Sequence, residues 1–232
     1  MVDVRPSAGG EPLHYAYLHG FASGPHSYKG GLLARALDEH GVHLHRPDLN
    51  VPSFERLTVT GSLAAIDAVD RAVAAGGGRW RLIGSSMGGY LAALWAAANP
   101  GRVDSLVLLC PGFGITERWP KLLGEEAMAA WKRRGTIDWP DGEGRVRPLH
   151  WAFVEDARRY PPEPEVPCPT LILHGTRDDV VPVETSRRYA ASRPHVSLVE
   201  LPDGHALLDV EGEVVAWTLR FFGLSPSTGG VR

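Results

Sequence analysis

The chain has 232 residues, a formal net charge of −3 and an apolar content of 44%, which suits one domain with a core of its own. Its 24 basic and 27 acidic residues form no electrostatic footprint for nucleic acid or for an anionic membrane. The two cysteines, Cys110 and Cys168, lie in no CxxC motif and no Cys/His cluster, which excludes a secreted disulfide scaffold and argues against a zinc module.

Short apolar runs alternate with helical patterns along the chain. Strands are expected at residues 14–18, 42–46, 80–83, 105–110, 169–173 and 196–201, and helices at 30–40, 57–75, 87–98, 183–192 and 210–222. Continuously apolar strands that alternate with helices indicate a parallel sheet covered on both faces. The sequence therefore predicts a single α/β domain with a mostly parallel sheet of about six strands flanked by helices.

One long segment, residues 113–167, interrupts this alternation, because connections between strands are usually only a few residues long. Helical pieces are expected within it near 125–134 and 149–160. We divide the chain accordingly into a core, residues 1–112 and 168–232, and an insert, residues 113–167.

The start of the chain, residues 1–12, has no apolar stretch behind a basic end, as a signal peptide would. The longest apolar run, residues 91–98, is far shorter than the roughly 20 residues that cross a bilayer. We therefore expect no membrane span and a cytoplasmic location.

Residues 84–88, GSSMG, match the pattern GxSxG and place Ser86 at its centre. The match follows the predicted strand 80–83 and precedes the predicted helix 87–98, which is the setting of a nucleophile elbow. The Met87 N–H, at the unpaired start of the helix, is placed to stabilise a developing oxyanion. A structural serine in a glycine-rich turn stays open as the alternative.

A serine nucleophile needs a histidine as base and a carboxylate that orients the histidine. Asp178 and Asp179 follow one late predicted strand, and Asp203 and His205 follow the last one. Both residue types therefore occur at the carboxyl edge of the sheet, where open α/β sheets bind their ligands.

These motifs, in this order, resemble the α/β-hydrolase superfamily and, within it, the short bacterial serine esterases. The resemblance extends over residues 15–222 and implies the α/β-hydrolase fold with a helical lid insert. The family pattern HGxxDxxVP is met by His174, Gly175, Asp178, Val181 and Pro182, the closing GH by Gly204 and His205, and the early HGx element by His19, Gly20 and Phe21.

The resemblance implies a catalytic triad of Ser86, Asp178 and His205. Asp178 aligns with the acid of the family, while Asp179 and Asp203 stay open as alternatives because of their closeness in sequence to Asp178 and His205.

The expected function is a serine hydrolase that cleaves carboxylic esters through an acyl-enzyme intermediate, with the N–H groups of Phe21 and Met87 as its oxyanion hole. Acyl-thioesters are the nearest alternative substrates, because the same triad cleaves both. A ligand-binding receptor or scaffold is the non-enzymatic alternative, since a fold does not fix a function. Neither a cofactor nor a metal is expected: His43 and His45 share one strand face but have no third ligand at a suitable spacing.

Four of the seven tryptophans lie in the insert, namely Trp119, Trp131, Trp139 and Trp151. As parts of a lid, these side chains would bind substrate by walling a pocket over Ser86. They would equally serve as a small satellite core that holds the insert onto the sheet. A mixture of the two roles is the prediction.

Overall fold

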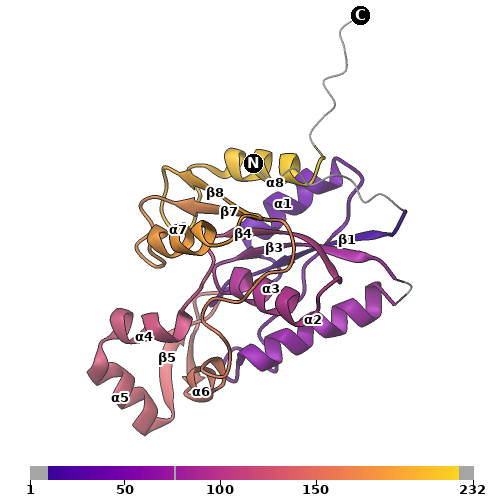
Figure 1. The fold of residues 1–232 in the computed structure, drawn as a ribbon. Helices are drawn as coiled ribbons and strands as arrows, with labels where there is room; N and C mark the ends of the chain where they lie inside the picture. Colours follow the sequence, from indigo (N-terminus) through magenta and orange to yellow (C-terminus); the bar gives the residue numbers. More distant parts are fainter. Residues whose placement is uncertain (1–9, 76, 225–232) are drawn as a thin grey trace, which may run out of the picture.

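The structure, a computed structural model, describes residues 10–75 and 77–224. A six-stranded sheet in the order β2-β1-β3-β4-β7-β8 crosses its centre, and every neighbouring pair of strands is parallel (Figure 1). Its strands are β1 (Leu13–Leu18), β2 (Leu44–His45), β3 (Arg79–Ser85), β4 (Val103–Leu109), β7 (Thr170–Gly175) and β8 (Val196–Leu201). The predicted fold class is thereby confirmed.

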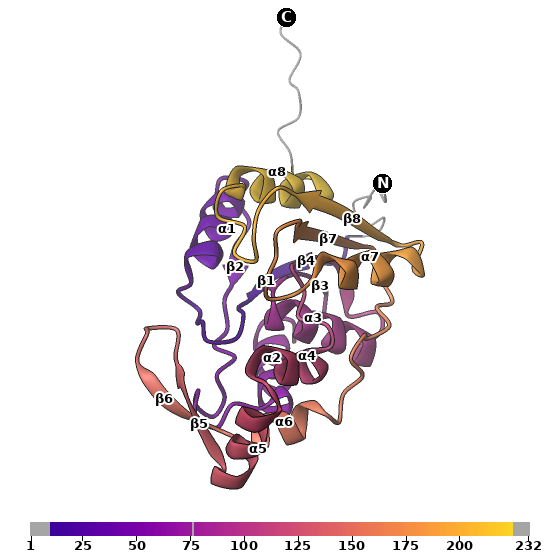
Figure 2. The same ribbon diagram turned by 90° about the vertical axis from the view of Figure 1, so that its left-hand side faces the viewer.

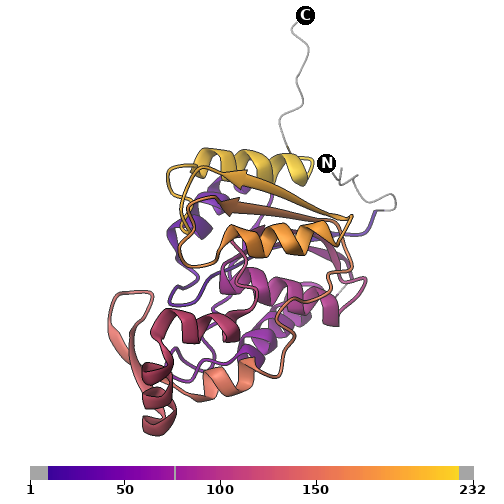
Figure 3. The ribbon, with the colours of Figure 1, turned by 60° about the vertical axis from the view of Figure 1, so that its left-hand side comes forward.

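Helices cover both faces of this sheet, because alternate side chains of each strand point to opposite sides. In β1, Tyr15 and Tyr17 join one buried apolar cluster, while Ala16 and Leu18 join the other. Helices α1 and α8 lie on the first face and α2, α3 and α7 on the second, as the α7 and α8 ribbons on either side of β7 and β8 show in Figure 3. These helices are α1 (Tyr28–Asp38), α2 (Val59–Val73), α3 (Met87–Ala98), α7 (Val183–Ala191) and α8 (Glu211–Phe221).

Helix α3 lies between the sheet and α2, and nearly all of its side chains are buried, from Met87 through Ala96. This central place explains why its sequence is apolar on all sides. Helix α2 begins two residues later than the sequence pattern indicated, since the Thr58 side chain caps it by accepting a hydrogen bond from the Gly61 N–H at 2.9 Å.

The insert between β4 and β7 lies beside the sheet and its helices as a group of short elements (Figure 2). They are α4 (Ile115–Leu123), α5 (Glu125–Arg134), β5 (Thr136–Pro140), β6 (Val146–His150) and α6 (Ala152–Ala157). Strands β5 and β6 form an antiparallel hairpin of their own.

The insert differs from the purely helical expectation in two places. The helix predicted over 149–160 is confined to α6, because Leu149 pairs with Ile137 in the hairpin and Pro148 cannot continue a helix. Helix α4 was not predicted, because Pro120 lies inside it.

One predicted strand, over 42–46, is shorter in the structure. It is the two-residue edge strand β2, which pairs only with β1. Across the part of the chain that the structure describes, none of the helices has both the length and the apolar character that crossing a membrane requires.

Candidate active site

The turn between β3 and α3 holds Ser86 in a strained backbone conformation, with φ 52° and ψ −118°. Such a positive φ is rare for a residue with a Cβ and persists only where its surroundings enforce it. A Cβ on Gly88 would lie 2.0 Å from the Leu18 carbonyl oxygen, and one on Gly84 would lie 2.4 Å from the Gly88 oxygen. Glycine at both positions therefore lets the turn pack against β1 and present Ser86 at the carboxyl edge of the sheet.

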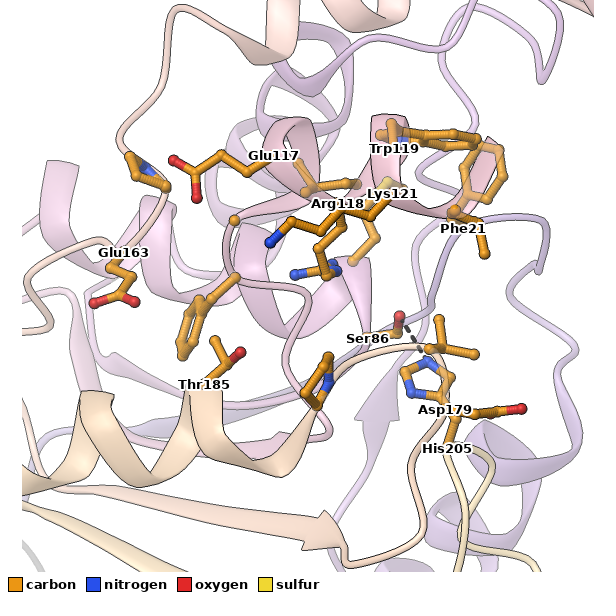
Figure 4. A pocket seen from close by; sticks show the side chains of 18 of the residues that line it. Phe21, Ser86, Glu117, Arg118, Trp119, Lys121, Glu163, Asp179, Thr185 and His205 are labelled. Atoms are coloured by element: carbon orange, nitrogen blue, oxygen red, sulfur yellow. Dashed lines mark hydrogen bonds between the residues drawn. The ribbon is translucent and has the colours of Figure 1, made fainter. Parts of the chain in front are cut away.

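Three side chains from three loops at this edge form one hydrogen-bonded row. The Ser86 Oγ lies 3.0 Å from Nε2 of His205, and Nδ1 of His205 lies 2.7 Å from Oδ2 of Asp178 (Figure 4 shows the first of these bonds). In the tautomer that fits both bonds, Nδ1–H donates to the carboxylate and Nε2 accepts from the serine hydroxyl. This is the arrangement in which a histidine can take a proton from a serine.

The loops after β7 and β8 meet closely enough to bring the acid and the histidine together. A Cβ on Gly175 would lie 2.4 Å from the carbonyl oxygens of both Asp203 and Gly204, and the Arg177 N–H donates to the Asp203 carbonyl oxygen at 2.9 Å. Parallel strands end at the same edge, so residues that follow β3, β7 and β8 converge there.

Of the three candidate acids, Asp178 is the one that bonds to His205. The carboxylate of Asp203 instead accepts hydrogen bonds from the N–H groups of Gly204 and Asp209, at 2.6 and 2.9 Å. Asp179 is exposed at the border of the neighbouring cavity.

The Asp178 carboxylate is fully buried and surrounded by donors. Its Oδ1 accepts from the N–H groups of Val180 and Val181, at 2.9 and 2.8 Å, and its Oδ2 lies 3.2 Å from Nε2 of His174 as well as beside His205. Burial opposes ionisation, but the hydrogen bonds from the two histidines and the Val181 N–H outweigh it and hold the pKa of Asp178 well below its usual range. The group is therefore an anion that can stabilise a protonated histidine.

The histidines of the two HG motifs, His19 and His174, have structural partners. His174 donates from Nε2 to the Val181 carbonyl oxygen at 2.8 Å and accepts at Nδ1 from the Ser186 hydroxyl at 2.7 Å. His19 donates to the Gly20 carbonyl oxygen at 2.9 Å and accepts from the Leu49 N–H at 3.0 Å. Both side chains therefore fix the loops that carry the predicted site residues.

Cys110, at the end of β4, lies under the row of hydrogen bonds. Its sulfur and one ligand atom each of Asp178 and His205 lie within 4.8 Å of one another. Burial raises the pKa of the Cys110 thiol to about 12, which keeps it protonated, whereas a metal would need the thiolate. The rings of His43 and His45 lie 4.6 Å apart, and no third ligand joins them in the described part of the chain.

The two residues of the predicted oxyanion hole border the same space as Ser86. Met87 is the first residue of α3, so its N–H is among those that have no partner within the helix. Phe21 follows β1 and contributes its ring to the wall of the cavity, 5.4 Å from the Trp119 ring. The structure therefore brings both residues to the cavity that Ser86 borders, and the role of their N–H groups stays a prediction.

A cavity of about 770 Å³ opens over Ser86 and His205. Helix α4 and the loop before α7 form much of its border, with side chains from both shown in Figure 4. Its apolar wall consists mainly of Phe21, Phe113, Ile115, Trp119, Leu122 and Trp139. A space of this size, apolar with a few polar groups, is typical of a small-molecule site.

The four tryptophans of the insert divide into two pairs. Trp119 and Trp139 line the cavity, with ring centroids 5.1 Å apart. Trp131 and Trp151 do not line it. They are 1% and 7% exposed and pack against each other behind Trp119, because their indole N–H groups bond within the insert, to the Leu149 carbonyl oxygen and to Glu155. The first pair therefore lies where substrate-binding side chains would, and the second pair lies where a satellite core would, while substrate contact itself stays a prediction.

Charged side chains on α4 and α7 were not singled out from the sequence, yet they border the cavity. They are Glu117, Arg118, Lys121 and Arg188. For Glu117, Arg118 and Lys121, the only indication in the sequence is that they lie in the insert. They share helix α4 with Trp119, and because that helix is not predicted from the sequence, neither is their place beside the cavity.

The chain is similar in sequence to known proteins. Residues 14–221 match the family described as Uncharacterised protein family (UPF0227). The chain is 28% identical over 216 residues to the Pimeloyl-[acyl-carrier protein] methyl ester esterase of Chromobacterium violaceum, covering 75% of this chain and 81% of that protein. It is 30% identical over 115 residues to the human Palmitoyl-protein thioesterase ABHD10, mitochondrial, covering 47% of this chain and 37% of that protein.

Solved structures agree on the fold. Est1E from Butyrivibrio proteoclasticus, in its complex with ferulic acid, superposes with a TM-score of 0.76 at 25% identity, over 91% of this chain and 88% of that one. The mouse Alpha/beta hydrolase domain-containing protein 10 superposes with a TM-score of 0.75 at 21% identity, over 91% and 90%. With its family match, its sheet order and these neighbours, the chain belongs to Uncharacterised protein family UPF0227, and it is an enzyme of the α/β-hydrolase superfamily.

Proposed function

We propose that this enzyme is a serine hydrolase that cleaves carboxylic esters through the triad Ser86, His205 and Asp178. The observation that carries the proposal is the continuous row from the Ser86 hydroxyl through both ring nitrogens of His205 to the buried Asp178 carboxylate, at the border of an apolar cavity. The similarity to an esterase over most of both chains supports the same reaction class.

In the acylation step, the Ser86 oxygen bonds to the ester carbonyl carbon while its proton passes to Nε2 of His205. The electron pair of the carbonyl moves onto its oxygen, which the N–H groups of Met87 and Phe21 stabilise. Collapse of this intermediate breaks the bond to the alkoxy group, which leaves as an alcohol with the proton from His205. Asp178 stabilises the transient positive charge on the ring.

In the deacylation step, a water molecule takes the role that the Ser86 hydroxyl has in acylation. His205 takes a proton from the water, the hydroxide bonds to the acyl carbon, and the Ser86 oxygen leaves with the proton returned by His205. The products are a carboxylic acid, an alcohol and the free enzyme. This mechanism uses no cofactor and no metal.

We propose further that residues 113–167 act as the lid of the core formed by residues 1–112 and 168–232. Helix α4 supports this role, since it borders the cavity directly over the predicted nucleophile. Acyl-thioesters are the second candidate substrates, on the ground of the similarity to a thioesterase over residues that make up 47% of this chain.

Labelling with a fluorophosphonate probe tests the nucleophile. The wild-type protein should react, and Ser86→Ala should not. Ser85→Ala is the matched control, because this neighbouring hydroxyl lies 3.5 Å from the Lys29 amine instead of bonding to His205, and it should label like the wild type. Equal labelling of Ser86→Ala and the wild type, or no labelling of the wild type, would contradict the proposal.

Steady-state kinetics tests the substrate class. The value of kcat/KM should be higher for alkyl esters than for thioesters of the same acyl group. A clear optimum at thioesters would replace the ester assignment with the second candidate, while the triad itself would stand.

A further inference from the structure

Arg118 places a cationic group inside the cavity that Ser86 and His205 border (Figure 4). Its Nη1 atom is buried and has no hydrogen-bond partner in the part of the chain that the structure describes. Burial lowers the pKa of Arg118 to about 10, against the opposing charges of Asp178 and Glu117, so the side chain remains a cation at neutral pH. The cavity therefore contains a positive charge with a donor unused by the protein.

Arg81 and Arg193, the arginines that are buried within the described residues, are paired. Arg81 donates from Nε to the Asp104 carboxylate at 2.8 Å, and Arg193 donates from Nε to Glu165 at 3.1 Å. The Nε atom of Arg79 makes no hydrogen bond, but it lies 3.6 Å from the Glu11 carboxylate, and Nη2 of Arg79 lies 3.0 Å from Asp104. Because an unsatisfied buried donor is destabilising, and a charged one more so, the lack of a hydrogen bond at Nη1 of Arg118 among the described residues points to a partner that arrives from outside the chain.

The acidic side chains around the cavity do not supply a hydrogen-bond partner for Nη1 of Arg118. Glu163 lies 3.7 Å from the Arg188 guanidinium, while Glu117 and Asp179 are exposed to water at the border. Lys121 lies one turn after Arg118 on the same helix and is exposed at the cavity without an ion pair among the described residues. The inner part of the cavity therefore favours an anion.

We propose that Arg118 determines specificity by binding a carboxylate on the substrate, so that the enzyme prefers esters that carry a second, free acid group. The inference rests on the proposed function and names the substrate class of the same site. A guanidinium presents two parallel N–H donors that match the two oxygens of a carboxylate. The apolar wall of Phe21 and Trp119 suits the carbon chain between the two groups. Half-esters of dicarboxylic acids have this chemistry.

The test compares the monomethyl ester of adipic acid with methyl adipamate, in which a neutral amide replaces the carboxylate. For the wild-type enzyme, kcat/KM should be about ten- to a hundredfold higher on the acid, since a hydrogen bond between charged groups contributes that much. The monomethyl esters of succinic and suberic acid vary the distance between the two groups. One of the three lengths should be preferred, because Arg118 is fixed relative to Ser86.

Variants of Arg118 should change the ratio of kcat/KM between the acid and the amide. Arg118→Met should lower the ratio to near one, and Arg118→Lys should retain part of it, because lysine keeps the charge but not the planar pair of donors. Lys121→Met should lower it less, since water screens an exposed charge. Arg133→Met is the matched control: the same change on the exposed side of α5, outside the cavity, should leave the ratio at its wild-type value.

Inhibition gives a readout that does not depend on turnover of a particular ester. Adipate should inhibit competitively in the wild type and weakly in Arg118→Met. Stronger inhibition by inorganic phosphate than by adipate would contradict the carboxylate assignment.

The outcomes separate this inference from the proposed function. If the wild type shows no preference for the acid, or if Arg118→Met keeps that preference, the role of Arg118 is overturned while probe labelling at Ser86 still supports a serine hydrolase. If neither labelling nor hydrolysis of any ester occurs, both proposals fail.

Discussion

In the acid of the proposed triad, hydrogen-bond donors set the pKa of one carboxylate. Asp178 accepts from two backbone N–H groups and has two histidines at its other oxygen. These donors favour the anion, and His174 in addition holds the loop by bonding to Val181 and Ser186. The pKa of Asp178 is lowered as a result, so the group is ionised throughout the proton transfers that the proposed mechanism assigns to His205.

Replacing Asp178 by Asn should lower kcat by about 10⁴-fold, because the amide would favour the wrong tautomer of His205. Steady-state kinetics on a simple alkyl ester measures this. Asp179→Asn is the comparison, since this exposed neighbour does not touch His205, and its loss should stay below about tenfold. A larger loss in Asp179→Asn than in Asp178→Asn would reassign the acid.

At the scale of elements, the insert combines an inner wall with a core of its own. Three of its aromatic rings, Trp119, Trp131 and Trp151, continue a row that begins at Phe21 of the core, with neighbouring centroids 5.3 to 5.4 Å apart. The first two rings border the cavity and the last two are buried behind them. Trp119 therefore contacts both the cavity and the buried rings behind it.

Trp131→Ala and Trp139→Ala should separate these two roles. Trp131 is 1% exposed, so its truncation should lower the free energy of unfolding by about 3–5 kcal/mol while the folded enzyme keeps its KM. Trp139 is half-buried at the cavity, so Trp139→Ala should raise KM and lower the free energy of unfolding by less than Trp131→Ala does. Urea denaturation and steady-state kinetics on each variant measure the two effects. A raised KM in Trp131→Ala with unchanged stability would show that this tryptophan acts on the substrate.

At the scale of the whole molecule, the ionisation of Asp178 makes the stability of the fold depend on pH. Because the pKa of Asp178 is lower in the folded protein than in the unfolded chain, ionisation of this group stabilises the fold at all pH values above about 4. This contribution is lost as the pH falls below about 4 and the unfolded chain gains a proton that the folded protein does not.

The free energy of unfolding should therefore fall between about pH 5 and pH 3, and it should fall less in Asp178→Asn, which has no proton to gain. Chemical denaturation at several pH values measures the slope. Asp209→Asn, the same change at an exposed position, should keep the wild-type slope. Equal slopes in the wild type and Asp178→Asn would contradict a lowered pKa of Asp178 in the folded protein.

The sheet and the loops that carry the proposed triad could be predicted because their patterns are local. Continuous apolar runs indicate buried parallel strands, and the glycines around Ser86 follow from a close approach of backbones. The hairpin and α4 could not, since the pairing of Leu149 with Ile137 and a helix that contains Pro120 are decided by contacts outside their own segments.

The sequence by itself therefore determined the fold class and the three loops that carry Ser86, Asp178 and His205, because parallel strands bring such loops to one edge whatever lies between them. Only the tertiary structure decided which acid bonds to His205 and which tryptophans line the cavity, and it alone showed that Nη1 of Arg118 has no hydrogen-bond partner among the residues the structure describes. The physical reason is that hydrogen-bond partners and burial depend on residues far apart in the chain, and the chain order of the insert does not contain that information.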